Sequence, residues 1–430
     1  MTSRSEKPLN EPREELRYGI RRNLKRSRKA QTEFLAELVK IPSDNPPGDC
    51  RAHAQRTRLL LQALNFKASE HSVPAEQVGA AGMKSIVNLV VRETFGQVSG
   101  GPVIALNAHG DVVPPGIGWS TEPYGAQIKK GFMFGRGVAV SKSDFATYAF
   151  ALLALKAAAP LNDYGLRGTV ELHFTYDEES GGELGPKWLL EQGISRPDYA
   201  ICAGFTHGIT IAHNGCLHLE VEVIGKSGHA AKPSTGIDAL EAANGIMAGL
   251  YALRKTWRSR RSSTRGIDAP TLVIGVVAGG INTNVVPDNV KFRIDRRIIP
   301  EENPRIAERE LISHIAKLAK KWPGIKVKTR RILLAKPFKP VRGQEKLVLL
   351  LQRNAREVLR DRLRTHGVPL YTDARHYSAA GIPTVLYGAG PRSLEEANGH
   401  RADEKLNLKD LYAATEVVAL SLADLLQSDV

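Results

Sequence analysis

The sequence predicts an α/β protein, with a mixed sheet flanked by helices, into which a smaller α+β domain is inserted. A length of 430 residues exceeds the size at which one hydrophobic core keeps growing, so two domains are expected. Short apolar runs alternate with amphipathic segments in the first half, as strands alternate with helices in a covered sheet. Between about residues 215 and 323 this pattern changes to strands accompanied by two long amphipathic segments.

The first part of the α/β region begins with helices and continues with alternating elements. Apolar spacing predicts helices at about 29–41 and 52–64, with the turn-rich IPSDNPPG between them. SIVNLVVRE and GPVIALNAHGD are β-branched runs bounded by turn residues, which predicts strands. The helix DFATYAFALLALKAA and the strand TVELHFTYDEE follow.

The inserted domain is predicted from three strands and two helices. The strands are LHLEVEVIG, TLVIGVVAGG and NVKFRIDRRI, and the helices are TGIDALEAANGIMAGLYAL and PRIAERELISHIAKLAKKW. Afterwards IPTVLYG predicts a strand and the segment from Leu408 a closing helix. We therefore expect a basic N-terminal leader (1–28), a first part of the main domain (29–214), the insert (215–323) and a second part (324–430).

Composition indicates an ordinary globular protein. The apolar fraction is 42%, and no run has the length or apolarity needed to cross a bilayer. The N-terminal thirty residues lack the apolar core of a secretory signal, so we expect a cytoplasmic protein without a membrane partner. Cys50, Cys202 and Cys216 are far apart, which favours buried thiols over a disulfide framework or a thiolate metal site.

The net charge of +15 raises the question of a nucleic-acid partner. Its basic residues form separate clusters in the leader, at 254–265 and at 317–331, with few interleaved aromatic residues. Solvated helix faces and loops explain this distribution better than a nucleic-acid surface does. The positive field would also concentrate a small anionic substrate.

Three polar motifs at the ends of predicted strands suggest a metal site. In NAHGDVVP, the spacing of His109 and Asp111 places both side chains on one side of an extended segment, although a capped loop is an alternative. YDEESGGELG offers a hard oxygen ligand beside a general base, or alternatively a solvated acidic loop. NGHRADE adds His400, and the combined His, Glu and His with a spare glutamate is typical of a catalytic metal site.

Sequence motifs follow one another along the chain in the order HGDVVP, GRGVAVSK, DEESGG, GKSGHAAKP, NVVPD with DRR, TDAR and the C-terminal histidine. This order resembles that of the dinuclear zinc amidohydrolase family. This family includes aminoacylases, acetylornithine deacetylase, succinyl-diaminopimelate desuccinylase and the glutamate carboxypeptidases. The resemblance implies a metallo-exopeptidase-like catalytic domain and an inserted domain that serves as a lid and in dimerisation.

The resemblance also implies residue roles and a homo-oligomer. Metal ligands are His109, Glu179 and His400, and catalytic residues are Asp111 behind the histidine, Glu178 as general base, and His229. In the family this last histidine reaches across a dimer interface to polarise the reacting group. Residues associated with substrate binding or with support of the site are Asn284, Arg297 and Arg375.

Two family carboxylates are missing, which predicts a changed metal content. Val140 stands where the family has the aspartate that bridges two metals, and Gly204 and Phe205 stand where it has another acid. Three ligands can complete one site but not two, so we expect one divalent transition metal per subunit, manganese or zinc. Asp144 could supply a replacement ligand if the helix has begun at Val140, but a helix cap or an ion pair is the simpler interpretation.

His207 and His376 lie close to motif segments and are further candidates for substrate contact, although satisfied loop histidines are the simpler alternative. The predicted reaction is attack of water on a C–N bond, with Glu178 taking the proton. The specific hypothesis is deamination of an aromatic amino carboxylate, because GRGVAVSKSDF and GFTHG resemble the 5-nitroanthranilate aminohydrolases. The alternatives are a peptidase or N-acyl-amino-acid deacylase, and an inactive binding protein on the same fold.

Overall fold

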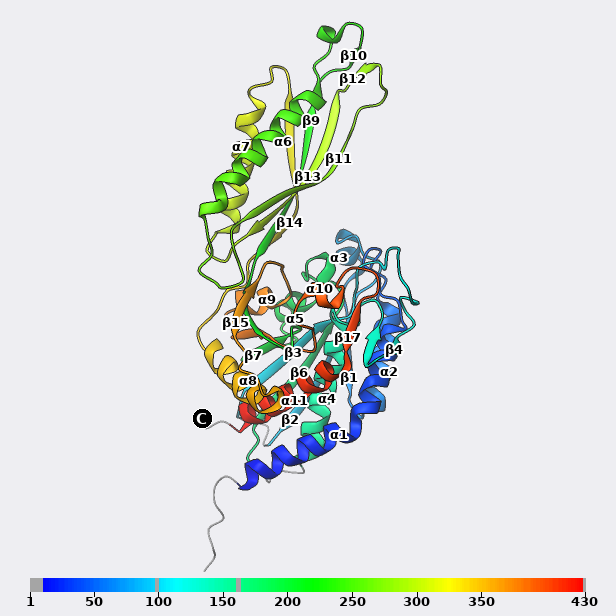
Figure 1. Ribbon diagram of the computed structural model, residues 1–430, viewed down its shortest axis with the longest axis vertical. Helices are drawn as coiled ribbons and strands as arrows, with labels where there is room; N and C mark the ends of the chain where they lie inside the picture. Colours follow the sequence, from blue (N-terminus) through cyan, green and yellow to red (C-terminus); the bar gives the residue numbers. More distant parts are fainter. Residues whose placement is uncertain (1–10, 97–99, 160–163, 428–430) are drawn as a thin grey trace, which may run out of the picture. The chain divides into compact units, whose positions relative to one another are not determined.

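The computed structural model describes residues 11–96, 100–159 and 164–427 (Figure 1). The chain divides into two compact units. The first comprises Met1–Ile211, Pro340–Thr365 and Thr372–Val430, and the second Ala212–Lys339 and His366–Tyr371. Part of the predicted leader, residues 1–10, lies outside the described residues.

A mixed eight-stranded sheet with helices packed on it confirms the predicted α/β class. The strand order is β1-β2-β6-β3-β7-β16-β8-β15. β3 runs parallel to β6 and β7, whereas β2 is antiparallel to both of its neighbours. The strands are β1 (Ala68–Ser72), β2 (Val87–Phe95), β3 (Val103–His109), β6 (Gly168–Thr175), β7 (Tyr199–Cys202), β8 (Ile209–His213), β15 (Thr365–Val368) and β16 (Thr384–Leu386).

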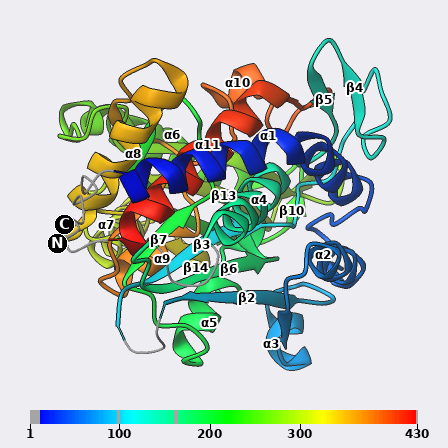
Figure 2. The same cartoon turned by 90° about the horizontal axis from the view of Figure 1, so that it is seen from below.

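Three long helices, α1 (Glu11–Val39), α4 (Lys142–Ala158) and α11 (Leu408–Leu426), pack together on one side of this sheet (Figure 2). Nearly every residue of α4 is buried, which explains why its sequence is apolar on all faces. The other helices of this unit are α2 (Arg51–Ala63), α3 (Ala75–Ala80), α5 (Pro186–Glu191), α8 (Gln344–Leu359), α9 (Ala374–Ala379) and α10 (Leu394–Ala397).

The first helix is longer than the sequence pattern predicted. It begins at Glu11 instead of about residue 29, because Leu16, Ile20 and Leu24 continue the helical apolar spacing and are buried in the core. The basic residues of the predicted leader are therefore interleaved with core positions of α1.

The second unit has the predicted α+β composition. Its antiparallel sheet has the order β11 (Thr271–Gly279), β13 (Asn289–Ile298), β9 (Gly215–Ile224), β14 (Lys326–Ala335). Helices α6 (Ala239–Thr256) and α7 (Pro304–Ala319) share a core with it, and β10 (Gly228–His229) pairs with β12 (Val285–Val286). The unit extends past the predicted end at 323 because β14 pairs with β9 along its length.

A small three-stranded sheet lies in the first unit and becomes important for the site. Its order is β17 (Lys405–Asn407), β5 (Phe132–Phe134), β4 (Gln127–Lys129). Within the described ranges, no helix has both the length and the apolar character required to cross a membrane.

A buried carboxylate on β6 makes the first unit sensitive to acid. Glu171 is 3% exposed and accepts hydrogen bonds from His173 Nε2 (2.9 Å), Arg92 Nε (2.5 Å) and Ser195 Oγ. Burial opposes ionisation, but these donors outweigh it and lower the pKa of Glu171 to about 2. Because the folded pKa is below the unfolded one, this stabilisation is complete above about pH 4.5 and is lost as the pH falls towards 2.

We expect Glu171→Gln to lower the free energy of unfolding by about 3 kcal/mol at pH 7. Urea denaturation at several pH values measures this difference. The gap between wild type and variant should be constant from pH 8 to 5 and shrink by about 1 kcal/mol at pH 3.5. A gap that stays constant down to pH 3.5 would contradict the assignment.

Candidate metal centre

The parallel pairing of β3 with β6 brings two of the sequence motifs to one edge of the main sheet. His109, the last residue of β3, pairs in register with Thr175, the last residue of β6. The loops that begin at Gly110 and Tyr176 therefore leave the sheet side by side. Chemistry-bearing side chains in α/β sheets gather at this carboxyl edge.

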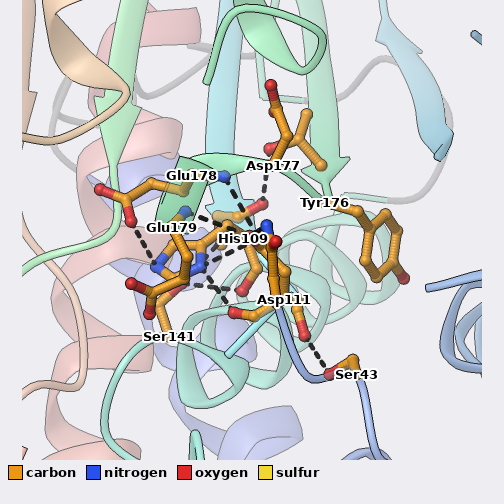
Figure 3. A network of polar contacts seen from close by, with 12 residues as sticks. Ser43, His109, Asp111, Ser141, Tyr176, Asp177, Glu178 and Glu179 are labelled. Carbon is orange, nitrogen blue, oxygen red and sulfur yellow. Dashed lines mark hydrogen bonds and ion pairs between the residues drawn. The ribbon is translucent and has the colours of Figure 1, made fainter. Parts of the chain in front are cut away.

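Asp111 lies behind the His109 imidazole, as the spacing of the two residues predicted. His109 Nδ1 lies 3.0 Å from the backbone oxygen of Asp111 and 3.4 Å from its Oδ1. The Asp111 carboxylate is fully buried and also accepts hydrogen bonds from the backbone N–H groups of Glu178 (3.3 Å) and Glu179 (3.1 Å). It thus joins the loop after β3 to the loop after β6 (Figure 3).

Two of the three consecutive acids face His109, and the third does not. Asp177 directs Oδ2 towards the N–H of Leu184 at 2.6 Å. Glu178 Oε2 lies 3.8 Å from His109 Nε2, and the donor atoms of His109, Glu178 and Glu179 all lie within 4.8 Å of one another. His400 is outside this three-residue group, but its Nε2 lies 3.3 Å from Glu179 Oε1.

The electrostatics of this group suit a bound cation. Burial raises the pKa of Glu178 well above its usual range, and the neighbouring carboxylates add to the effect of burial. Burial favours neutral His109, but Glu178 and Asp111 outweigh it and raise the pKa of the imidazole well above its usual value. The hydrogen bond with Glu179 likewise raises the pKa of His400. Imidazole nitrogens and carboxylate oxygens in this arrangement fit a zinc or manganese ion.

Asp144 does not join the cluster of donor atoms among the described residues. The helix α4 begins at Lys142, so Val140 precedes it, and the condition for a helical face shared by Val140 and Asp144 is not met. The carboxylate of Asp144 is buried and accepts hydrogen bonds from the N–H groups of Ala389 (2.7 Å) and Gly204 (3.2 Å). Burial raises the pKa of Asp144 to about 7.

Arg375 and His376 support the acidic loop. Arg375 is 4% exposed, and its Nη2 donates to the backbone oxygen of Gly181 and to Glu183 Oε1 at 3.2 Å. His376 Nε2 lies 3.3 Å from the same Gly181 oxygen. Of the two roles that the sequence left open for Arg375, these contacts correspond to support of the site.

His207 is hydrogen-bonded to Asp410, with 3.0 Å between Nε2 and Oδ1. This contact matches the simpler interpretation, a loop histidine with a satisfied partner. It gives no direct support to a substrate contact.

Three predicted residues belong to the second unit. His229 is exposed on β10, and its Nδ1 accepts a hydrogen bond from the N–H of Ala231 at 3.0 Å. Asn284 lies beside it, because its backbone oxygen accepts from the N–H of Ala230 at 3.0 Å. Arg297, on β13, forms a bidentate ion pair with Asp295 at 3.0 and 3.1 Å.

Sequence reasoning missed several residues that shape the site. Asn45 Nδ2 donates to Asp111 Oδ2 at 3.0 Å, but its turn-rich segment gave no functional signal. Asp373 lies inside the TDAR motif and is buried, and a side chain at Gly182 would bring a Cβ within 2.0 Å of its Oδ1. Glu404 ends NGHRADE and is also buried.

Comparison with known proteins agrees with the motif order. The sequence model of peptidase family M20/M25/M40 matches residues 105–424, which is most of the chain. The chain belongs to this family. As an M20 family member it is a metal-dependent hydrolase that acts on C–N bonds.

Individual M20 relatives cover most of the chain. Acetylornithine deacetylase of Myxococcus xanthus is 29% identical over 368 residues, covering 84% of this chain and 89% of the relative. Succinyl-diaminopimelate desuccinylase of Wolinella succinogenes is 26% identical over 406 residues, covering 91% and 98%. The solved structure of human carnosine dipeptidase 1 shares the fold, with a TM-score of 0.72, 17% identity and coverage of 96% and 99%.

Proposed function

We propose that this M20 hydrolase holds one divalent metal ion through His109, Glu179 and His400 and uses Glu178 as its general base. The observation that carries the proposal is the cluster of His109, Glu178 and Glu179 at one edge of the main sheet, with His400 in contact with Glu179. Glu178 and Glu179 face His109 from one loop, and His400 approaches from a segment more than two hundred residues later.

Each of these side chains has a separate role in the proposed mechanism. His109, Glu179 and His400 would hold the divalent ion, which when bound would supply Lewis-acid activation of the scissile group and of water. Asp111 fixes the orientation of the His109 ring through Nδ1, which leaves Nε2 for the ion. Glu178 accepts the proton of the attacking water and returns it to the departing nitrogen, so the C–N bond breaks with a neutral amine as leaving group.

The proposed single-metal content rests on the two missing carboxylates. A Bacillus subtilis M20 peptidase of the same fold, with a TM-score of 0.65, is described as binding a dinuclear metal centre. In the present chain, Val140 offers no ligand atom, and a Cβ on Gly204 would approach the backbone nitrogen of Tyr387 to 2.6 Å. The structure around position 204 therefore leaves no room for a side chain, which argues against an acidic residue at this position.

We favour an amide substrate with a carboxylate group, as in an N-acyl amino acid or a dipeptide. The names of the relatives support this class, since one removes acetyl from acetylornithine and another succinyl from succinyl-diaminopimelate. The predicted substrate roles of Asn284, Arg297, Arg375, His207 and His376, and that of His229 in polarising the reacting group, stay predictions.

Deamination of 5-nitroanthranilate is the second candidate. Its support is the altered metal site at Val140 and Gly204, because an electron-poor ring carbon can accept metal-activated hydroxide and spread the negative charge into the nitro group. Assays of metal-loaded enzyme on N-acetyl and N-succinyl amino acids, dipeptides and 5-nitroanthranilate separate the candidates. Turnover of the aromatic amine alone would replace our first candidate, and turnover of none would favour the inactive binding protein.

We also propose a homodimer formed through the edge strand β11. Within the described part of the second unit, β11 ends the sheet and exposes Val273, Val276 and Val277 by 54%, 50% and 51%. An exposed apolar edge strand is a template for pairing with a second copy. The cytoplasmic location expected from the sequence stays a prediction.

The dimer has a direct test. Light scattering should give twice the chain mass of 46.9 kDa for wild type and a single chain mass for the double variant Val276→Lys, Val277→Lys. Leu349→Lys, on exposed α8 of the first unit, is the matched control and should stay dimeric. A monomeric wild type at micromolar concentration would refute the proposal.

A further inference from the structure

The turn that contains Val140 is bound to the segment that carries His400 by one buried carboxylate. β5 and β17 are antiparallel neighbours, with Phe134 paired to Lys405. The next bond of this ladder runs from the N–H of Gly135 to the backbone oxygen of Glu404 at 3.0 Å. The pairing therefore brings Glu404 to the start of GRGVAV.

The Glu404 carboxylate accepts hydrogen bonds from several residues of this turn. Its Oε2 accepts from Arg136 Nη1 (2.7 Å) and the N–H of Gly137 (3.2 Å). Its Oε1 accepts from the N–H groups of Ala139 (3.0 Å) and Val140 (3.2 Å). Glu404 and Arg136 are each 1% exposed, so charge-assisted bonds hold the turn in a place where solvent does not compete.

Arg136 extends the connection to two further segments. Its Nη2 donates to the backbone oxygens of Arg401 (3.2 Å) and Pro115 (3.1 Å). The guanidinium also lies over the Trp119 ring, 5.3 Å from the ring centroid. The residue following His400 is thus tied by its backbone to the same buried cation that binds Glu404.

His400 needs such support because its own side chain is poorly packed. The His400 imidazole is 51% exposed, and its Nε2 lies 3.3 Å from Glu179 Oε1. Its backbone has a φ of 62°, in the left-handed region that few residues other than glycine adopt. The position of Nε2 therefore depends on how firmly the segment around it is held.

We propose that Arg136 and Glu404 are positioning residues that hold His400 in place to bind the metal ion. This inference rests on the proposed function, since it requires His400 to be a metal ligand. Residues that orient a ligand from behind affect metal affinity by about 10- to 100-fold when they are replaced. The buried pair would act on the metal without touching it.

The test measures zinc affinity by competition with a chromophoric chelator, at a temperature well below unfolding. We expect Glu404→Gln, which keeps the size of the side chain and removes its charge, to weaken zinc binding by about 10- to 100-fold. His400→Ala should weaken it as well. The double variant should bind no more weakly than His400→Ala, because Glu404 acts through that histidine.

A matched control separates positioning from loss of stability. Asp424 is a buried carboxylate in the last turn of α11, bonded to Arg353 at 2.5 Å and to Asn354 at 2.8 Å. Asp424→Asn should lower the melting temperature and leave zinc affinity unchanged. Arg136→Lys provides a second variant, expected to weaken zinc binding, if Glu404→Gln fails to fold.

The outcomes distinguish this inference from the proposed function. If His400→Ala weakens zinc binding but Glu404→Gln and Arg136→Lys do not, the positioning role is wrong and the ligand assignment stands. Equal weakening by Asp424→Asn, or additive losses in the double variant, would also overturn positioning through His400. If His400→Ala leaves zinc affinity unchanged, both proposals fail.

Discussion

We expect Glu178→Gln to lower kcat by about 10² to 10⁴-fold, because the amide cannot accept the proton of the attacking water. Its Oε2 lies 3.8 Å from His109 Nε2, so the carboxylate stands beside the expected ion. Substrate and metal binding should change little, since the proposed ligands are His109, Glu179 and His400. Steady-state kinetics together with metal analysis of the purified variant measures these quantities.

A matched control for this variant is Glu191→Gln, which removes the same charge from the end of α5, where the side chain is 61% exposed. It should keep wild-type kcat. A Glu178→Gln enzyme that retains kcat within a few-fold would refute the role as general base. Loss of the metal together with activity would instead make Glu178 a ligand.

Removal of the metal by a chelator should abolish activity, and one equivalent of Zn²⁺ or Mn²⁺ per chain should restore it. The three proposed ligands, His109, Glu179 and His400, would suffice for one catalytic site with an open position. Elemental analysis of the dialysed enzyme gives the stoichiometry. We expect one ion per chain, and loss of that ion in His109→Ala.

Asp144→Asn serves as the comparison for the metal count. Because both Asp144 oxygens accept backbone hydrogen bonds from Ala389 and Gly204, this variant should retain one ion per chain. Loss of the ion would make Asp144 the replacement ligand that the sequence left open. Two tightly bound ions in the wild-type enzyme would refute the single-metal proposal.

The sequence predicted the elements of the fold well where apolar periodicity was clear. α2, α6, β9 and β13 lie close to their predicted ranges, because alternation and helical spacing reflect burial directly. The start of α1 was placed about eighteen residues late, because the basic residues between Leu16, Ile20 and Leu24 hid the apolar stripe. The end of the second unit was also placed too early, since β14 is only partly buried and rich in basic residues.

The sequence by itself determined the family, the motif order and the absence of carboxylates at Val140 and Gly204. These features depend on residue identity and spacing along the chain, which a sequence records completely. Only the tertiary structure decided which polar side chains meet. The pairing of strands places Glu178 near His109, and the β5–β17 pairing places Glu404 next to the turn at Val140. The carboxylate of Asp144 accepts backbone hydrogen bonds. These contacts join segments that are distant in sequence, so they depend on packing.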